Sequence, residues 1–183
     1  MRENQRETGI DVVGKVDWGS HFCAFYHNKD ELRSILVPYV KAGIEGNEAC
    51  VWVTSGTITS DEAYKVLSAK VPDLKDRVKS GQVEIIRAQD WYTKNGKFNS
   101  KEVLAGWHEK AMVAKERGFE GLRATGDTSW LSKEDWDKFV EYESAIGGET
   151  HGQTILVLCT YSLDLWEAYQ MIDVVSTHEF ALI

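Results

Sequence analysis

The stretch Thr154-Ile-Leu-Val-Leu-Cys-Thr160 is the most hydrophobic run of this chain. Five consecutive apolar residues between two threonines are typical of a strand that is buried on both faces, as at the centre of a parallel sheet. Further strand-like runs lie before and after it, at 21–26, 48–54, 82–87, 121–125 and 179–183. We therefore expect these six runs to form one sheet, with 154–160 near its centre.

Segments with helical spacing separate the predicted strands. Several begin with a polar capping residue followed three positions later by an acidic one, as in Asn28 and Glu31 or Thr59 and Glu62. The expected helices cover about 28–43, 59–69, 73–80, 99–114, 132–147 and 163–175. Regular alternation of strand and helix predicts a three-layer α/β domain, a mainly parallel sheet with helices on both faces.

The length of 183 residues suits one domain. Residues 1–18 are polar and are expected to form a loosely ordered tail, whereas 19–183 form the single domain. With 21 basic and 29 acidic residues the net charge is −8, which argues against direct binding of nucleic acid.

The N-terminal residues contain no apolar leader, and no apolar run has the roughly 20 residues that a membrane-spanning helix needs. Cys23, Cys50 and Cys159 are widely spaced in hydrophobic stretches, as expected of reduced, buried thiols. These features predict a cytoplasmic protein that does not act at a membrane.

The carboxyl ends of the predicted strands are the expected ligand-binding edge, because open α/β sheets bind ligands there. A crevice at this edge would be lined mainly by aromatic side chains and would suit a small apolar or aromatic ligand. The same aromatic residues could instead simply pack loops against the sheet. The candidate residues at these strand ends are Tyr26, His27, Trp91, Tyr92, Asp127, Trp130 and Tyr161.

The first strand-to-helix turn is where an α/β nucleotide-binding protein would hold phosphate. Residues 25–32 contain no glycine, so the backbone cannot form the usual glycine-rich phosphate cradle. Asp30 and Glu31 would repel phosphate, and Lys29 is the only suitable cation there. Tight binding of Mg-ATP at this turn is not expected.

Arg123 lies inside a predicted strand and needs a partner if it is buried. Glu143 falls on the apolar stripe of the following helix, so a buried Arg123–Glu143 pair is expected, with Asp127 as a possible third member. This pair could be structural or could clamp a ligand.

His21 and Cys23 share one face of the first strand. A metal site would need a further ligand such as His178 or Cys159, and no tight Cys/His cluster is expected. We therefore expect a core histidine and a core cysteine, no metal and no cofactor. No catalytic triad motif can be assembled, which predicts a protein that is not an enzyme.

Many short matches along 19–183 resemble one family, the methanogen/methylotroph, DcmR sensory (MEDS) domain. They include His21-Phe-Cys-Ala-Phe-Tyr26, Leu36-Val-Pro38, Glu48-Ala-Cys-Val-Trp-Val53, Asp90-Trp-Tyr92, Gly121-Leu-Arg-Ala-Thr-Gly126, Leu158-Cys-Thr-Tyr161 and Thr177-His178. The resemblance implies a RecA/KaiC-like fold without a functional phosphate loop. It also implies a prokaryotic, methanogen-type sensory domain for hydrocarbon derivatives, found in front of histidine-kinase or DNA-binding parts.

Together these observations predict a non-catalytic signal-transduction input domain that binds a small organic ligand, hydrocarbon-derived or one-carbon. Arg123, Asp127 and Glu143 would orient the ligand, and a histidine kinase or transcription regulator would supply the output, in cis or in trans. Two alternatives are open. One is residual nucleotide binding through Lys29 and Asp127, and the other is a ligand-free interaction module that forms a homodimer.

Overall fold

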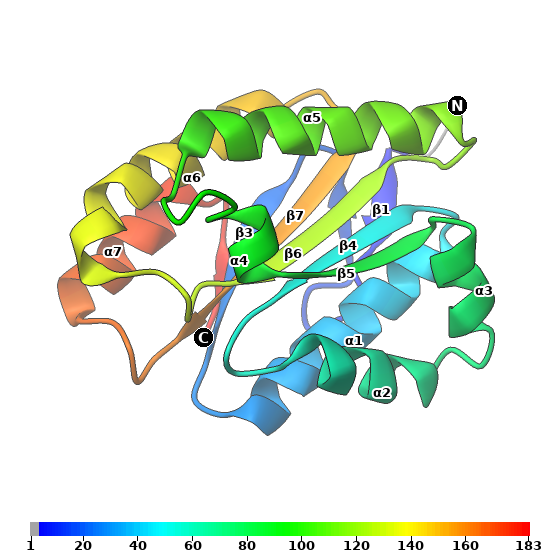
Figure 1. Ribbon diagram of the computed structural model, residues 1–183, viewed down its shortest axis with the longest axis horizontal. Coiled ribbons are helices and arrows are strands. Elements are labelled where there is room, and N and C mark those ends of the chain that lie inside the picture. Colours follow the sequence, from blue (N-terminus) through cyan, green and yellow to red (C-terminus); the bar gives the residue numbers. More distant parts are fainter. Residues whose placement is uncertain (1–3) are drawn as a thin grey trace.

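The computed structural model describes residues 4–183. Its main sheet has six strands in the order β5-β4-β6-β7-β3-β8, and every pairing between neighbours is parallel (Figure 1). The strand that contains the most hydrophobic run lies inside the sheet, as the sequence predicts. The strands are β3 (His21–Tyr26), β4 (Ala49–Thr54), β5 (Val83–Arg87), β6 (Leu122–Asp127), β7 (Ile155–Ser162) and β8 (Ala181–Leu182).

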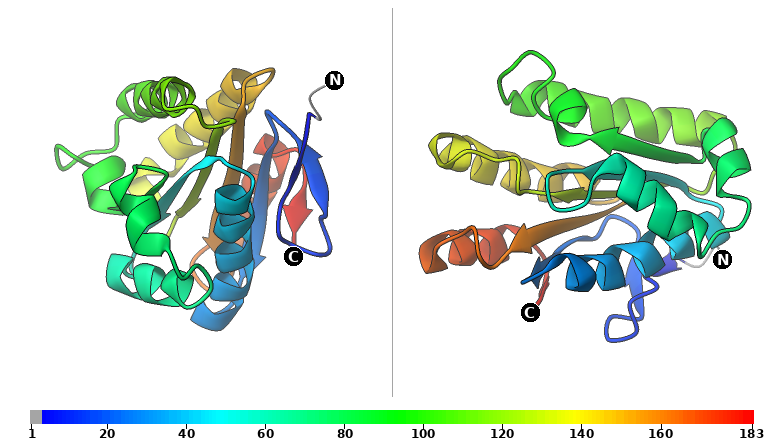
Figure 2. Two further views of the ribbon diagram at one scale, coloured as in Figure 1. Left: turned by 90° about the vertical axis from the view of Figure 1, so that its right-hand side faces the viewer. Right: turned by 60° about the horizontal axis from the view of Figure 1, so that its bottom comes forward.

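Helices cover both faces of this sheet, so the predicted three-layer α/β fold is confirmed (Figure 2). One face packs against α1 (Lys29–Glu45), α2 (Ser60–Ser68) and α3 (Leu74–Lys79). The other face packs against α4 (Ala88–Trp91), α5 (Ser100–Glu116), α6 (Trp136–Thr150) and α7 (Ala168–Thr177), with a short 3-10 turn, η1 (Lys133–Asp135), before α6.

The predicted caps fix where the helices begin. Asn28 accepts hydrogen bonds from the backbone at the start of α1, and Thr59 and Glu62 form a reciprocal capping box before α2. Helix α7 begins at Ala168, five residues later than predicted. The reason is that β7 continues to Ser162, and the N–H of Leu163 then donates to the carbonyl of Tyr26 at 2.9 Å.

The N-terminal segment differs from the prediction of a loosely ordered tail. It forms an antiparallel hairpin of β1 (Gln5–Glu7) and β2 (Lys15–Asp17) that lies beside α1 (Figure 2). Thr8 and Val16 of this hairpin are buried. The hairpin was missed because its strands are three residues long and mostly polar, so they carry no hydrophobic alternation.

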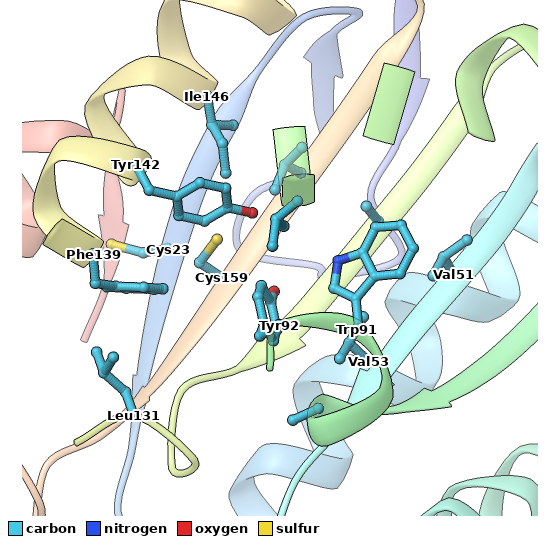
Figure 3. Packing of buried hydrophobic residues seen from close by; sticks show 14 of the residues in the cluster. Cys23, Val51, Val53, Trp91, Tyr92, Leu131, Phe139, Tyr142, Ile146 and Cys159 are labelled. Carbon is cyan, nitrogen blue, oxygen red and sulfur yellow. The ribbon is translucent and has the colours of Figure 1, made fainter. Parts of the chain in front are cut away.

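The two faces of the sheet hold two separate cores. On the α6 side, Cys23 and Cys159 of neighbouring strands lie under Tyr142 and Ile146 (Figure 3). All three cysteines are free and buried, as expected. In residues 4–183 no helix combines the length and the apolar character that crossing a membrane requires.

Candidate functional site

The carboxyl ends of β3 and β6 meet in a polar network centred on Asp127. The Tyr26 hydroxyl donates to Asp127 Oδ1 at 2.7 Å, and the Ser129 hydroxyl donates to Oδ2 at 2.8 Å. Ser55 also donates to Oδ2, and Thr57 lies 3.1 Å from the Tyr26 hydroxyl. Burial and the adjacent carboxylate raise the pKa of Tyr26 well above its ordinary value, so the phenol stays protonated and can donate.

The first turn of α1 is closed by its own side chains. Asn28 Oδ1 accepts from the backbone N–H groups of Asp30 and Glu31, each at 3.0 Å. The N–H of His27 donates to Glu31 Oε2 at 2.8 Å, and His27 itself is exposed. Lys29 pairs with Glu62 at 2.8 Å. Three of the amides that could hold a phosphate at this helix N-terminus are therefore already occupied.

The three predicted aromatic residues Trp91, Tyr92 and Trp130 do come together. Tyr92 stacks on Trp130 with ring centroids 4.6 Å apart and planes inclined by 12°, and Trp91 lies against Trp107 of α5 at 4.4 Å. Figure 3 shows Trp91 and Tyr92 next to each other, both on the α5 and α6 side of the sheet. They lie on this side because Trp91 ends the short helix α4 and Tyr92 directly follows it.

Trp91 forms the common wall of two adjoining pockets beneath α5, which we call the α5 groove. The pockets have volumes of about 230 and 310 Å³. Lys94, Gly106 and Glu109 line both pockets as well. The ammonium groups of Lys94 and Lys110 each lie 5.3 Å from the Trp91 ring centroid. The Trp91 Nε1 atom is buried and has no hydrogen-bond partner in the part of the chain that the structure describes.

The predicted Arg123–Glu143 pair is wrong. Arg123 donates to Glu48, with 2.5 Å from Nε to Oε2, and to the backbone carbonyls of Tyr39 and Glu7 at 2.9 and 2.8 Å. Strand alternation places Arg123 on the α1 face, whereas α6 carries Glu143 on the opposite face. Asp127 is not part of this ion pair either, because its carboxylate lies in the network with Tyr26.

Glu143 instead lies between two histidines. Its Oε2 atom is 3.1 Å from His21 Nε2 and 3.2 Å from His178 Nε2. Cys159 Sγ lies 3.5 Å from His21 Nε2 and 3.8 Å from Glu143 Oε1. All four side chains are buried, and their ligand-type atoms lie within 4.8 Å of one another. This corrects the expectation that no tight Cys/His cluster exists.

Burial governs the protonation states in this cluster. Burial acts to raise the pKa of Glu143, but the two imidazoles beside it hold the pKa at about 2, so the group is a carboxylate. Burial lowers the pKa of His21 below its ordinary value, although Glu143 acts in the opposite direction. Burial and the carboxylate both raise the pKa of the Cys159 thiol.

The nine predicted site residues therefore do not line one crevice. Tyr26 and Asp127 form the polar network. Trp91 and Tyr92 line the α5 groove, Trp130 stacks on Tyr92, and Arg123 lies on the opposite face of the sheet. Tyr161 packs edge-on against His178, with centroids 5.9 Å apart, and its hydroxyl is buried without a partner.

Several residues of these sites were not expected from the sequence. Ser55, Thr57 and Ser129 surround Asp127, Glu48 holds Arg123, and Lys94 and Gly106 shape the groove. The serine and threonine residues in the turns after β4 and β6 were the available signal for the network around Asp127. All carboxyl ends of a parallel sheet lie at one edge, so these turns are expected to be close together. Nothing in the sequence singles out Glu48 or Gly106.

Solved structures with this fold include two archaeal proteins. The flagellar accessory protein FlaH from Methanocaldococcus jannaschii superposes with a TM-score of 0.61 at 14% identity, covering 97% of this chain and 78% of that one. The KaiC-like protein PH0186 from Pyrococcus horikoshii gives a TM-score of 0.63 at 15% identity, with the same coverage. At this identity the likeness confirms the predicted RecA/KaiC-like fold alone.

A curated sequence relative is the transcriptional repressor DcmR of Methylorubrum extorquens, which is 25% identical over 177 residues. The match covers 93% of this chain and 61% of the repressor, so the chain spans less than two thirds of that protein. The family model described as "MEthanogen/methylotroph, DcmR Sensory domain" matches residues 20–179. Nearly the whole folded domain lies within this match, and the role that it supports is sensory or regulatory. The chain therefore belongs to the MEDS family of sensory domains.

Proposed function

We propose that this chain is the non-catalytic input domain of a signalling system and that it binds a small organic molecule in the α5 groove. The observation that carries the proposal is the Trp91 indole, a buried hydrogen-bond donor without a partner at the shared wall of two pockets. A buried donor of this kind costs free energy until an acceptor reaches it. A ligand that turns the Trp91 ring within the groove would supply that acceptor.

The groove fits a small ligand with an apolar body and one acceptor group. The larger of its two pockets, about 310 Å³, falls at the lower end of the range for small-molecule sites. Trp91, Tyr92 and Val103 offer apolar contact, whereas charged side chains make the rest of the lining polar. Lys94 would lie near an acceptor on the ligand, and Lys110 is already paired with Glu84. This chemistry accommodates hydrocarbon-derived or one-carbon compounds that carry a halogen, carbonyl or carboxylate group.

The aromatic contacts offer a route from the groove to the rest of the domain. Tyr92 lies between the groove and Trp130, which follows the end of β6. Tyr92 also packs edge-on against Tyr142 of α6, with centroids 6.4 Å apart. A ligand that favours one arrangement of Trp91 and Tyr92 would bias these contacts, as a two-state switch requires. A DNA-binding or histidine-kinase module, in cis or in trans, would receive the signal.

The test compares the wild-type chain with Trp91→Phe and a matched control, Trp166→Phe. Both tryptophans are 7% exposed, and both have an indole N–H without a partner. Trp166 packs on Trp136 and does not line the groove. A panel of halogenated and methylated one-carbon compounds and small aromatic acids is screened by thermal unfolding, and positive compounds are titrated by calorimetry.

We expect at least one compound to raise the unfolding temperature of the wild type and of Trp166→Phe. Trp91→Phe should bind that compound about tenfold more weakly, because the lost hydrogen bond is worth about 1.4 kcal/mol. Equal affinity in all three proteins would remove Trp91 from the site. No response to any compound of these classes would contradict the proposed ligand class.

A second candidate function, self-association, is favoured by the apolar surface of α7. Ile172, Tyr169 and Val175 are 69%, 58% and 43% exposed, and Ile172 and Val175 line an apolar hollow of about 420 Å³ with Ile183. A continuous apolar surface of this kind marks an interaction site, and twofold pairing is the commonest form of self-association. Light scattering of wild type and Ile172→Glu tests it: a concentration-dependent dimer should be lost in the variant.

A further inference from the structure

Four buried side chains from four elements converge on one point between the sheet, α6 and α7. His21 begins β3, Cys159 lies in β7, Glu143 lies in α6, and His178 directly follows α7. Their accessible fractions are 1%, 5%, 2% and 8%. They are far apart in the sequence, and the pairing of β3 with β7 brings the first two together.

The hydrogen bond that His178 donates leaves the lone pair of its Nε2 atom directed at Glu143. His178 Nδ1 lies 2.7 Å from the carbonyl oxygen of Val174, and because a carbonyl can only accept, Nδ1 carries the proton. In the neutral ring Nε2 is then an acceptor, and it faces the carboxylate oxygen Oε2 at 3.2 Å. Within residues 4–183, neither His178 Nε2 nor Glu143 Oε2 has a hydrogen-bond partner of acceptable geometry.

At this distance the two atoms need either a proton on His178 Nε2 or a metal ion between them. In residues 4–183 neither Lys nor Arg forms an ion pair with Glu143, and its neighbours of this kind are the two histidines. An Nδ1–H held by a backbone carbonyl is the usual outer contact of a metal-binding histidine, because it fixes the ring and leaves Nε2 free.

Three of the six separations between the four ligand atoms are close to those around a tetrahedral ion, and all six are within 4.8 Å. Ligand atoms about 2.0–2.3 Å from a tetrahedral metal lie roughly 3.3–3.6 Å from one another. The observed separations are 3.1 and 3.2 Å for the two nitrogen–oxygen pairs and 3.5 Å for sulfur to nitrogen. Small side-chain adjustments would be enough to admit an ion.

We propose that His21, Glu143, Cys159 and His178 bind one divalent transition-metal ion, with Zn²⁺ as the best match. Two imidazoles, a thiolate and a carboxylate are borderline-soft donors, which disfavour Mg²⁺ and Ca²⁺. Binding displaces the thiol proton of Cys159 to solvent. The site then holds two positive charges from the metal and one negative charge each from thiolate and carboxylate, so it is neutral, as a buried site requires.

This metal is structural, because four protein ligands close its coordination sphere. It joins β3 and β7 to α6 and to the end of α7, the helix that carries the exposed apolar surface. The site is separate from the α5 groove, so it can exist whether or not the groove binds a ligand.

The experiment uses Co²⁺ as a spectroscopic probe on the whole chain. The protein is stripped with a chelator, titrated with Co²⁺, and compared with Cys159→Ser, His178→Gln and the matched control Cys23→Ser. Cys23 is also a buried thiol of the same core, but it does not belong to the cluster. Metal content after purification is measured by mass spectrometry.

We expect one Co²⁺ per chain in the wild type, a thiolate-to-cobalt charge-transfer band, and displacement of Co²⁺ by Zn²⁺. Cys23→Ser should keep the band. Cys159→Ser should lose it, and both cluster variants should bind at least tenfold more weakly. The wild-type spectrum tests thiolate ligation even if a variant fails to fold. No saturable binding by the wild type, or an unchanged band in Cys159→Ser, would overturn the proposal and leave a protonated His–Glu–His cluster.

Discussion

The guanidinium of Arg123 is bound to Glu48, with Nε 2.5 Å from Oε2 and Nη2 3.1 Å from Oε1. Both side chains are 1% exposed. Arg6 of the N-terminal hairpin binds the same carboxylate at 2.7 Å, and Arg123 also donates to the Glu7 carbonyl. This one carboxylate therefore ties the hairpin to the centre of the sheet.

Glu48→Gln should strongly destabilise the domain, because it leaves the buried Arg123 charge uncompensated. Breaking such a pair from one side costs about 3–5 kcal/mol of unfolding free energy. Urea denaturation measures the loss. Glu45→Gln is the control, since Glu45 pairs with Lys41 on the exposed surface of α1 and should cost less than about 1 kcal/mol. Equal losses in the two variants would show that the buried pair contributes little.

Gly9→Ala should be much more damaging than Gly14→Ala. Both glycines have positive φ, +76° and +67°, so both variants incur the strain of a left-handed residue. A Cβ on Gly9 would lie 2.2 Å from the Pro38 carbonyl oxygen, whereas one on Gly14 meets nothing within 4 Å. We expect about 1 kcal/mol for Gly14→Ala and at least twice that for Gly9→Ala. Similar losses of stability in the two variants, measured by thermal unfolding, would mean that the contact between the hairpin and α1 contributes little to stability.

Millimolar Mg-ATP should leave the unfolding temperature of the wild type within about 1 °C of its nucleotide-free value. Asp127 is already bonded to Tyr26 and Ser129, and the first amides of α1 are bonded to Asn28. A nucleotide at 100 times its Kd would add about 2.7 kcal/mol, a shift of several degrees. A shift of that size that disappears in Lys29→Ala would revive the nucleotide-binding alternative.

The order of strands and helices could be read from the sequence because hydrophobic periodicity is local. The run at 154–160 has apolar side chains on both faces of the strand. It is therefore expected inside the sheet, whichever strands are its neighbours. The caps at Asn28 and Thr59 act within four residues and were equally readable. The fold class follows from such local signals alone.

The sites could be predicted only in part, because they depend on which strands and helices become neighbours. Alternation along the strand correctly places Arg123 on the other face of the sheet from Leu122 and Ala124. It does not say which of the two faces α6 covers. The predicted Arg123–Glu143 pair was wrong for this reason. His21 and Cys159 are 138 residues apart and meet only through the pairing of β3 with β7. Local periodicity carries no information on that pairing.

Alkaline pH should destabilise the domain, with a measurable share from Cys50. Burial raises the pKa of the Cys50 thiol well above its ordinary value of 9.0, so the folded chain keeps a proton that the unfolded chain loses. A raised folded-state pKa contributes stability that is complete below about pH 9 and declines as the pH rises further.

For each pH unit above about pH 9, one such buried thiol lowers the free energy of unfolding by about 1.4 kcal/mol. Urea unfolding of wild type and Cys50→Ala at pH 7–10.5 measures this slope, and comparing slopes cancels the packing cost of the substitution. The variant should lose stability less steeply above pH 9, and the two curves should run parallel below it. Parallel curves across the whole range would mean that the Cys50 thiol ionises in the folded protein, which its full burial against Val40 and Glu48 opposes.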